Sequence, residues 1–235
     1  MWSGPRNIST AMMRSWENRA DTQVVDEPFY AFYLSHYDTD HPMTPEVLAS
    51  QPTSWEEVVE QLILCPMVEP VYYQKHMTHH MLPGMDLSWT QQLQHCFLIR
   101  DPELVVNSYA QKRETVTSED IGITRQYELY EEISAITGQK IPIVVGADVL
   151  KNPRDMLSTL CECLDVPFSQ SMLSWPPGRR ESDGVWAPHW YEAVEASTGF
   201  APYKTAQLQL TAKQQAVADA NQAPYQALFE KRLIV

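Results

Sequence analysis

The start of the chain gathers the groups that bind a phosphate or a sulfate. Gly4 and Pro5 predict a turn, and Ser9 and Thr10 are typical first residues of a helix. A turn that leads directly into a helix brings backbone N–H groups and the positive end of the helix dipole to one point, beside the guanidinium of Arg6. The segment therefore predicts an anion site, and the alternative is an ordinary capped surface helix.

Four charged side chains, Arg6 among them, lie at or just after the ends of stretches that are predicted to be strands. Parallel strands end at a common edge of their sheet, where ligands bind, so we expect these four side chains to meet there. The first of the strands is apparently truncated. The strands and the charges after them are 1–3 with Arg6, 22–26 with Glu27, 71–75 with Lys75, and 95–99 with Arg100.

Helical periodicity fills the stretches between the strands, and the alternation predicts one α/β domain over residues 1–235. Its sheet should be mostly parallel, with helices on both faces. A further strand is expected at residues 141–145, and residues 36–52 and 173–199 read as loop, short helix or irregular chain. Helices are expected at residues 9–19, 29–35, 55–64, 89–94, 103–113, 123–136, 154–164 and 211–232, with Pro224 as a candidate break in the last.

Composition narrows the classes of partner. The chain has 235 residues, with 17 Lys and Arg against 30 Asp and Glu, a net charge of −13. This charge argues against broad binding to nucleic acid or to an anionic membrane, so an anionic ligand needs a local cluster of cations. No stretch approaches the roughly 20 apolar residues of a membrane helix, and no signal peptide is visible, so we expect a cytoplasmic protein.

Cysteine and histidine spacing gives little support to a metal site. Cys65, Cys96, Cys161 and Cys163 form no C-x-x-C pair, and we expect buried thiols of a reducing compartment. The spacing of His76, His79 and His80 could mark a metal site, but no cysteine or carboxylate lies nearby in sequence to complete it. We therefore expect no metal.

Two motifs resemble the cofactor-binding motifs of the sulfotransferase family. Both are strand–loop–helix units in the order that the family has, about ninety residues apart. The resemblance spans most of the chain and is closest to bacterial sulfotransferase-like proteins and to the sulfotransferase-like part of some proteins labelled as aminotransferase-like. The first is Gly4-Pro5-Arg6-Asn7-Ile8-Ser9-Thr10, with Ile8 where Gly is usual, and the second is Phe97-Leu98-Ile99-Arg100-Asp101-Pro102 followed by Ser108-Tyr109.

This resemblance implies a P-loop NTPase-like three-layer α/β/α fold and 3′-phosphoadenosine 5′-phosphosulfate as the sulfuryl donor. The first motif would bind the 5′-phosphosulfate and the second the 3′-phosphate. A looser likeness around residues 178–186 implies that arginines there close over the donor. The donor-binding residues so implied are Arg6, Asn7, Ile8, Ser9, Thr10, Arg100, Ser108, Arg179 and Arg180.

Transfer of a sulfuryl group needs a base for the acceptor and a positive group near the bridging oxygen. Glu27 resembles the glutamate base of sugar and tyrosine sulfotransferases, with Asp26 as the near alternative. Lys75 resembles the lysine that supports the leaving group. His76 is a second candidate base, because a neutral imidazole suits proton abstraction near pH 7.

Two other functions remain open from the sequence. A P-loop kinase would use Ser9, Thr10 and Asp101 around Mg²⁺, but no Lys precedes Ser9 as the kinase motif requires. A non-catalytic nucleotide-binding module of the same fold is the second alternative. Aromatic residues in 30–70 and 175–190 could wall a pocket for a small-molecule acceptor or pack onto the core. The oligomeric state is open.

Overall fold

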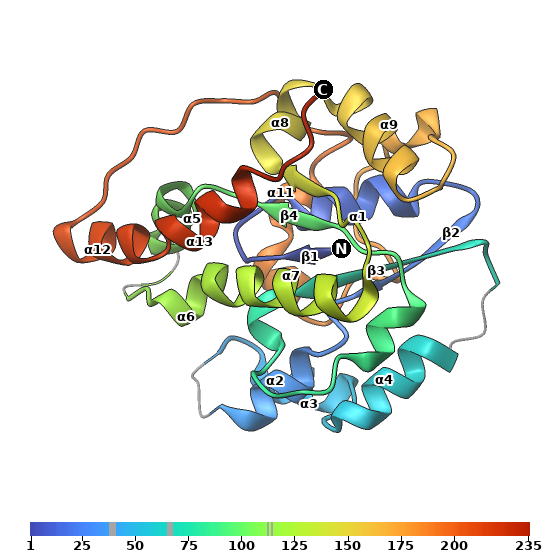
Figure 1. The fold of residues 1–235 in the computed structure, drawn as a ribbon, viewed down its shortest axis with the longest axis horizontal. Coiled ribbons are helices and arrows are strands. Elements are labelled where there is room, and N and C mark those ends of the chain that lie inside the picture. Colours follow the sequence, from blue (N-terminus) through green and yellow to red (C-terminus); the bar gives the residue numbers. More distant parts are fainter. Residues whose placement is uncertain (38–40, 65–67, 112, 114) are drawn as a thin grey trace.

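A parallel sheet of five strands forms the centre of the computed structural model, which describes residues 1–37, 41–64, 68–111, 113 and 115–235. The strand order is β2–β3–β1–β4–β5, and each neighbouring pair is parallel, which confirms the predicted α/β class. Helices lie around the sheet, with α8 and α9 toward the top of Figure 1 and α2, α3 and α4 toward the bottom. The strands are β1 (Trp2–Ser3), β2 (Thr22–Asp26), β3 (Val71–Met77), β4 (Phe97–Ile99) and β5 (Ile143–Val145).

The helices connect these strands and continue beyond the last of them. One set of helices follows the first four strands. They are α1 (Ser9–Glu17), α2 (Tyr30–His36), α3 (Thr44–Ser50), α4 (Trp55–Leu64), η1 (Thr78–His80), η2 (Ser88–Gln92), α5 (Pro102–Ala110), α6 (Ser118–Ile121) and α7 (Ile123–Thr137). After β5 come α8 (Gly146–Lys151), α9 (Pro153–Cys163), η3 (Gln170–Leu173), α10 (Ala187–Trp190), α11 (Glu192–Glu195), α12 (Ala212–Ala220) and α13 (Gln222–Phe229).

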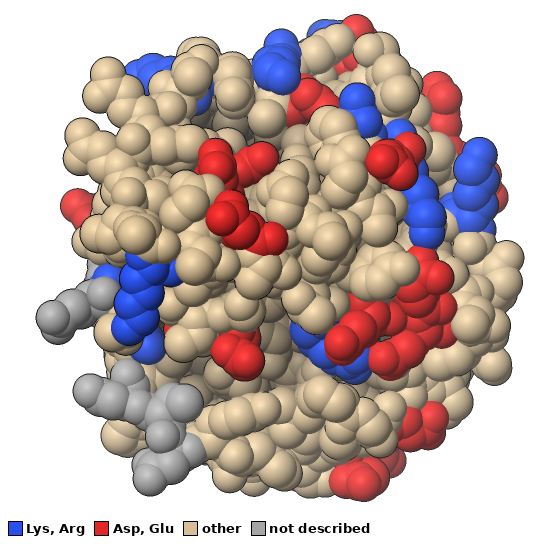
Figure 2. All heavy atoms as spheres, turned by 60° about the vertical axis from the view of Figure 1, so that its left-hand side comes forward, with Lys and Arg blue, Asp and Glu red and all other residues tan. Residues whose placement is uncertain are grey.

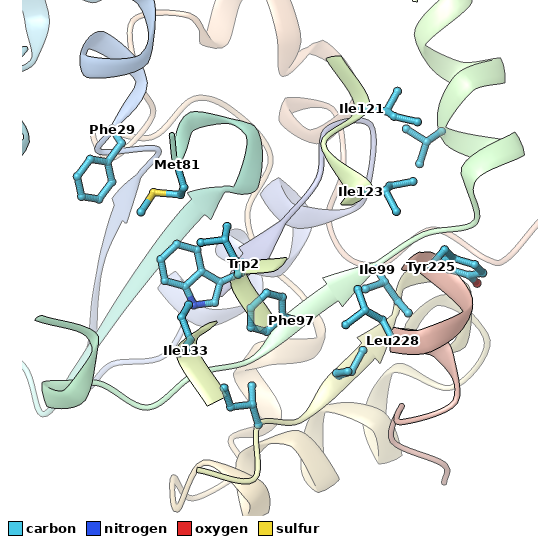
Figure 3. Close-up of a cluster of buried hydrophobic side chains, with 14 of the residues drawn as sticks. Trp2, Phe29, Met81, Phe97, Ile99, Ile121, Ile123, Ile133, Tyr225 and Leu228 are labelled. Atoms are coloured by element: carbon cyan, nitrogen blue, oxygen red, sulfur yellow. The ribbon is translucent and has the colours of Figure 1, made fainter. Parts of the chain in front are cut away.

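The two faces of the sheet carry separate hydrophobic cores, because successive side chains of a strand point to opposite faces. In β4, Phe97 and Ile99 pack in a cluster with Ile133 of α7 and Leu228 of α13, as Figure 3 shows. Leu98, between them, packs in a second cluster with residues of α1, α8 and α9. Each such fully buried side chain contributes about 1.5–3 kcal/mol. These two cores fix the sheet, and with it the loops at its carboxyl edge.

The observed elements differ from the predicted ones mainly beyond β5. The helix α8 begins directly at Gly146 and was not predicted, because it is a single short segment without periodicity. The predicted C-terminal helix is broken at Asn221 rather than at Pro224. Pro224 lies in the first turn of α13, where its missing N–H is not needed. Asn221 is fully buried, and its side chain donates to Val217 O at 2.9 Å.

Two smaller expectations, on the burial of the cysteines and on surface charge, can also be compared with the structure. Cys96 and Cys161 are buried as expected, whereas Cys163 is exposed, which corrects the expectation of a buried thiol there; Cys65 lies outside the described residues. The face drawn in Figure 2 carries acidic side chains in several groups, with Lys and Arg between them and no broad basic area. On this face the negative charge of the chain is spread rather than concentrated.

Candidate functional site

The loop of residues 4–8 joins β1 to α1 and is fixed by its asparagine. Asn7 Nδ2 donates to Leu98 O at 3.2 Å, and Asn7 Oδ1 accepts from Ile8 N at 2.9 Å. Arg6 has a φ of +54°, a left-handed conformation that costs roughly 1–3 kcal/mol in a non-glycine residue. Ile8 at the N-cap offers no side-chain oxygen to α1, so an external anion could satisfy the first N–H groups of that helix.

Gly146 holds this loop from the side of β5. A Cβ atom at Gly146 would lie 2.6 Å from Asn7 Oδ1, closer than Cβ atoms approach other heavy atoms in proteins. A glycine is therefore needed for β5 and α8 to pack against the loop. The conformation of the loop thus depends on contacts from both β4 and the start of α8.

Two guanidinium groups converge beside the loop. Arg6 Nε donates to Ser108 Oγ on α5 at 3.1 Å, and Arg100 Nη1 donates to the carbonyl oxygen of Arg6. Burial lowers the pKa of both arginines, and the charge of Arg6 lowers that of Arg100 further. Among the salt bridges between described residues, none involves Arg6 or Arg100. A bound anion would relieve the repulsion between these two cations.

The acidic residue next to Arg100 serves the following helix instead. Asp101 is the N-cap of α5, and its carboxylate accepts from Glu103 N at 2.9 Å and from Leu104 N at 3.4 Å. This carboxylate is thus engaged by backbone donors at the start of α5. The helix begins at Pro102, whose fixed φ suits a first turn, and it carries Ser108 back toward Arg6.

A second polar cluster lies at the ends of β2 and β3. The strands pair in register, with Asp26 opposite Lys75. Lys75 Nζ donates to Asp26 Oδ1 at 2.7 Å, to Glu27 Oε1 at 2.7 Å and to the Tyr191 hydroxyl at 2.8 Å, so all three of its N–H groups are used. The Tyr191 hydroxyl in turn donates to Asp26 Oδ2 at 2.7 Å.

Burial and the neighbouring charges together set the pKa values of Glu27 and Lys75. Burial raises the pKa of Glu27; the charge of Lys75 opposes this shift and that of Asp26 adds to it. Burial alone would lower the pKa of Lys75, but Asp26 and Glu27 raise it well above its ordinary value. Lys75 therefore remains a cation, while Glu27 holds its negative charge less firmly than an exposed carboxylate. Glu27 also has a strained backbone, with a φ of +43°.

One cavity of about 380 Å³ joins the two clusters. The predicted residues that line it are Arg6, Asn7, Ile8, Ser9, Thr10, Glu27, Lys75, Arg100 and Ser108. Its remaining walls come largely from segments that no motif marked, namely α2, η1, α10, α11 and the chain after them. The cavity can therefore hold an anionic ligand at the arginines with a carboxylate and a lysine beside it.

His76 is placed elsewhere, which corrects the expectation that it belongs to this site. Its ring is 2% exposed and stacks on Trp2 with 4.4 Å between ring centroids. Its Nε2 lies 3.1 Å from Gln74 Oε1. Because side chains alternate along a strand, Lys75 and Met77 line the cavity while His76, between them, faces the core.

The two arginines expected to close over the cofactor also lie outside the cavity lining. Arg179 is exposed, and Arg180 Nη2 donates to Pro176 O at 3.3 Å. Residues that come after Arg180 in sequence, such as Trp186, reach the cavity instead of the two arginines. Asp183 forms a fully buried salt bridge with Arg14 of α1 at 2.6 Å, which ties this segment to the rest of the fold.

Tyr191 is a site residue that no motif predicted, and Trp186 ends the loose likeness at residues 178–186 but was given no role there. Trp186 Nε1 donates to the Tyr191 hydroxyl at 3.1 Å, and both residues line the cavity. Tyr191 contacts Lys75 and Asp26, which lie 116 and 165 residues away in sequence. The only signal was the abundance of aromatic residues in this stretch, which fits a pocket wall and loop packing equally well.

Comparison with known proteins identifies the family of the chain. Residues 1–229 match the family described as "Sulfotransferase domain". The chain belongs to this sulfotransferase family. Its fold is similar to that of the sulfotransferase domain from the curacin biosynthetic pathway (TM-score 0.53, 16% identity, 93% of this chain and 95% of that one). It is also similar to the sulfotransferase from Alicyclobacillus acidocaldarius (TM-score 0.56, 11% identity, 99% and 96%).

A closer relative in sequence carries a different name. The chain is 36% identical over 204 residues to "Branched-chain-amino-acid aminotransferase-like protein 1" of Arabidopsis thaliana. The match covers 86% of this chain and 36% of that protein, so the sulfotransferase-family chain spans about a third of its relative. The relative's name therefore describes a much longer protein.

Two further searches of the described residues concern metals and membranes. Within the described ranges, no group of three or more His, Cys, Asp or Glu side chains is placed to hold a metal ion. None of the helices that the structure describes is long and apolar enough to cross a membrane.

Proposed function

We propose that the protein transfers a sulfuryl group from 3′-phosphoadenosine 5′-phosphosulfate to a hydroxyl or amine of a small-molecule acceptor, without a metal. The observation that carries this proposal is the shared cavity. It places two guanidiniums that form no salt bridge with a described carboxylate next to the largely buried pair of Glu27 and Lys75. Membership of the sulfotransferase family supports the reaction class.

The donor fits the groups around the arginines. Arg6, Ser9, Thr10 and the first N–H groups of α1 would bind the 5′-phosphosulfate, and Arg100 would bind the 3′-phosphate together with Ser108. The two phosphate groups of the donor would give Arg6 and Arg100 the negatively charged partners that no described carboxylate provides. The 3.1 Å contact between Arg6 and Ser108 would hold the two subsites in a fixed relation.

Glu27 is the base in this proposal. Asp26 does not line the cavity, and both its oxygens already accept hydrogen bonds, Oδ1 from Lys75 and Oδ2 from Tyr191. Glu27 does line the cavity, and its raised pKa makes its carboxylate a stronger base than an exposed one. It would take the proton of the acceptor as the new bond forms.

Lys75 would stabilise the charge that develops on the oxygen leaving the sulfur. The donor supplies the activated sulfuryl group, and positioning and fixed positive charge lower the barrier. Lys75 has three hydrogen-bond partners at present, so it must exchange one of them for the donor. Tyr191 and Asp26 would keep its ammonium group in place during that exchange.

The proposal is tested by incubating the purified protein with labelled donor and a panel of small alcohols, phenols and amines in the presence of a chelator. Formation of 3′-phosphoadenosine 5′-phosphate together with a labelled product is expected. Transfer that instead requires ATP and Mg²⁺ would identify a kinase and overturn the proposal. Tight nucleotide binding without transfer to any acceptor would identify a non-catalytic binding module.

A further inference from the structure

The side of the cavity next to Glu27 is walled by aromatic and imidazole rings. Tyr30, His80, Trp186 and Trp190 all line it. Tyr30 stacks on His80 with 4.6 Å between centroids and 14° between planes, and it meets Trp186 edge to face at 5.0 Å. The other face of His80 stacks on Tyr33 at 4.9 Å. These rings hold one another in place and form a rigid aromatic wall.

The charged side chains of the cavity are the two arginines expected at the donor and the pair of Glu27 and Lys75. The Lys, Arg, Asp and Glu side chains that line the cavity are Arg6, Arg100, Lys75 and Glu27. The first two are expected to meet the donor, and the last two pair with each other at 2.7 Å. A charged group on the acceptor would thus find no free partner of opposite sign among these residues once the donor is bound.

Two of the histidines that line the cavity, His79 and His80, are neutral near pH 7. Burial lowers the pKa of His79 to about 3 and that of His80 well below its ordinary value. Both are in η1 and line the cavity. Burial also raises the pKa of Tyr30, so its phenol is protonated. The wall therefore carries rings without net charge at these positions.

Few polar atoms of the wall are available to a ligand. The Tyr30 hydroxyl lies 2.5 Å from His41 Nδ1, and Trp186 Nε1 donates to Tyr191. Nδ1 of His79 and Nδ1 of His80 are buried without a hydrogen-bond partner in the described part of the chain. A sugar, with many hydroxyls to satisfy, would leave most of them unpaired here.

We infer that the acceptor is an uncharged aromatic compound with a hydroxyl group, whose ring packs against Trp190 in this wall of rings. This inference rests on the proposed sulfuryl transfer. The acceptor oxygen forms a bond to sulfur and its proton passes to Glu27. The bond between sulfur and the bridging oxygen breaks, and its electron pair leaves with 3′-phosphoadenosine 5′-phosphate. Aromatic contacts and exclusion of charge would together select the acceptor.

A matched pair of ligands tests the inference directly. Methyl 4-hydroxybenzoate and 4-hydroxybenzoate have the same ring and hydroxyl but differ in one charge near pH 7. Calorimetry with and without 3′-phosphoadenosine 5′-phosphate measures the binding of each, with methyl glucoside as the neutral sugar. We expect the ester to bind at least about tenfold more tightly than the acid or the glucoside, because a buried unpaired charge or hydroxyl is costly.

Variants of the wall separate ring packing from other causes. Trp190 is half-buried at the cavity, and Trp190→Ala should weaken ester binding roughly threefold to tenfold by loss of aromatic contact. Tyr37→Ala removes an aromatic ring that is 47% exposed and outside the cavity lining, and it should leave binding unchanged. Tyr30→Phe keeps the ring and should also bind the ester nearly as the parent does.

The outcomes distinguish this inference from the proposed function. If the acid or the glucoside binds as tightly as the ester, or if Trp190→Ala has no effect, the inference is overturned even where the nucleotide binds. If the nucleotide does not bind, the proposed donor is wrong, and the titrations without nucleotide still decide what the wall recognises.

Discussion

Among the side chains at the cavity, Arg6 and Glu27 have an unusual backbone. Both adopt positive φ values, +54° and +43°, where an ordinary L-residue is strained. Each is held there by hydrogen bonds: the carbonyl of Arg6 accepts from Arg100, Glu27 N donates to Lys75 O at 2.9 Å, and Gln51 donates to the Glu27 carbonyl at 3.1 Å. Such strain recurs at functional sites, and here it aims one cation and one carboxylate into the same cavity.

Glu27→Gln keeps the size of the side chain and removes its basicity. If Glu27 takes the proton of the acceptor, turnover should fall roughly 10²–10⁴-fold while nucleotide affinity changes little. Steady-state rates and nucleotide titration of the same preparation measure the two quantities. His76→Asn is the matched comparison, since His76 faces the core. Loss of turnover in His76→Asn with full activity in Glu27→Gln would reverse this assignment.

The raised pKa of Glu27 predicts the acid side of the pH profile. A base acts in its deprotonated form, so kcat/KM should fall as pH drops through the pKa of Glu27 in the free enzyme. Because burial raises that pKa, the fall should begin above the ordinary carboxyl value of 4.5. The profile of kcat/KM against pH measures it. A profile that stays flat down to pH 4.5 in a folded protein would argue against Glu27 as the base.

At this scale the sequence predicted the four charged residues of the cavity but misplaced His76, Arg179 and Arg180. Arg6, Lys75 and Arg100 end or follow strands, and apolar runs in the sequence indicate where those strands end. His76 could have been excluded from the start, because neighbours in a strand face opposite sides and Lys75 was already assigned to the cavity. Tyr191 could not have been found, because its partners are distant in sequence and only the tertiary fold brings them together.

Among the elements, the junction of β5 and α8 supports the loop of residues 4–8. Gly146→Ala would bring a Cβ to 2.6 Å from Asn7 Oδ1 and must displace either the loop or α8. We expect a loss of about 1–3 kcal/mol in unfolding free energy and weaker nucleotide binding. Urea denaturation and nucleotide titration measure these two effects.

The control for this variant is Gly146→Ala made in a protein that already carries Asn7→Ala. Asn7→Ala removes the atom that the new methyl group would meet, so Gly146→Ala should cost less stability there than in the parent. Equal costs in the two backgrounds would mean that Gly146 does not act through the loop.

Element boundaries were predicted well where local signals were strong. The strand β2 and the helix α4 have the bounds read from their apolar periods. The helix α8 was missed because it continues directly from β5 with one turn and a half of sequence that has no periodic pattern. The break at Asn221 was missed because it depends on tertiary hydrogen bonds to α6 and α7, from Asn221 to Ser118 at 2.9 Å and from Thr124 to Asn221 at 3.1 Å.

For the molecule as a whole, buried neutral histidines link stability to pH. Trp2 Nε1 donates to His95 Nδ1 at 3.1 Å, and the other ring nitrogen, Nε2, lies 2.9 Å from Thr90 O. The ring is therefore neutral with its proton on Nε2, and burial lowers its pKa to about 4. The unfolded chain, with an ordinary value of about 6.5, binds the extra proton first, so the stability from His95 is present above that value and is lost as pH falls.

His95→Gln should remove this part of the acid sensitivity. A glutamine can accept from Trp2 and donate to Thr90, so the variant should be close to the parent in stability near neutral pH. Between pH 7.5 and pH 5 the parent should lose about 2 kcal/mol more unfolding free energy than the variant. Urea denaturation at both pH values measures the difference. His189→Gln, at an exposed position, should follow the parent; identical pH dependence in all three proteins would contradict the assignment.

The central claim is that the cavity binds the donor nucleotide through Arg6 and Arg100, and calorimetric titration with 3′-phosphoadenosine 5′-phosphate in a chelator tests it most directly. The parent should bind. Arg100→Ala should weaken binding by about 2–4 kcal/mol, because a charge-assisted contact to a phosphate is lost. Arg179→Ala, which removes an exposed arginine outside the cavity lining, should bind as the parent does. An Arg100→Ala protein that binds the nucleotide as tightly as the parent would contradict the account.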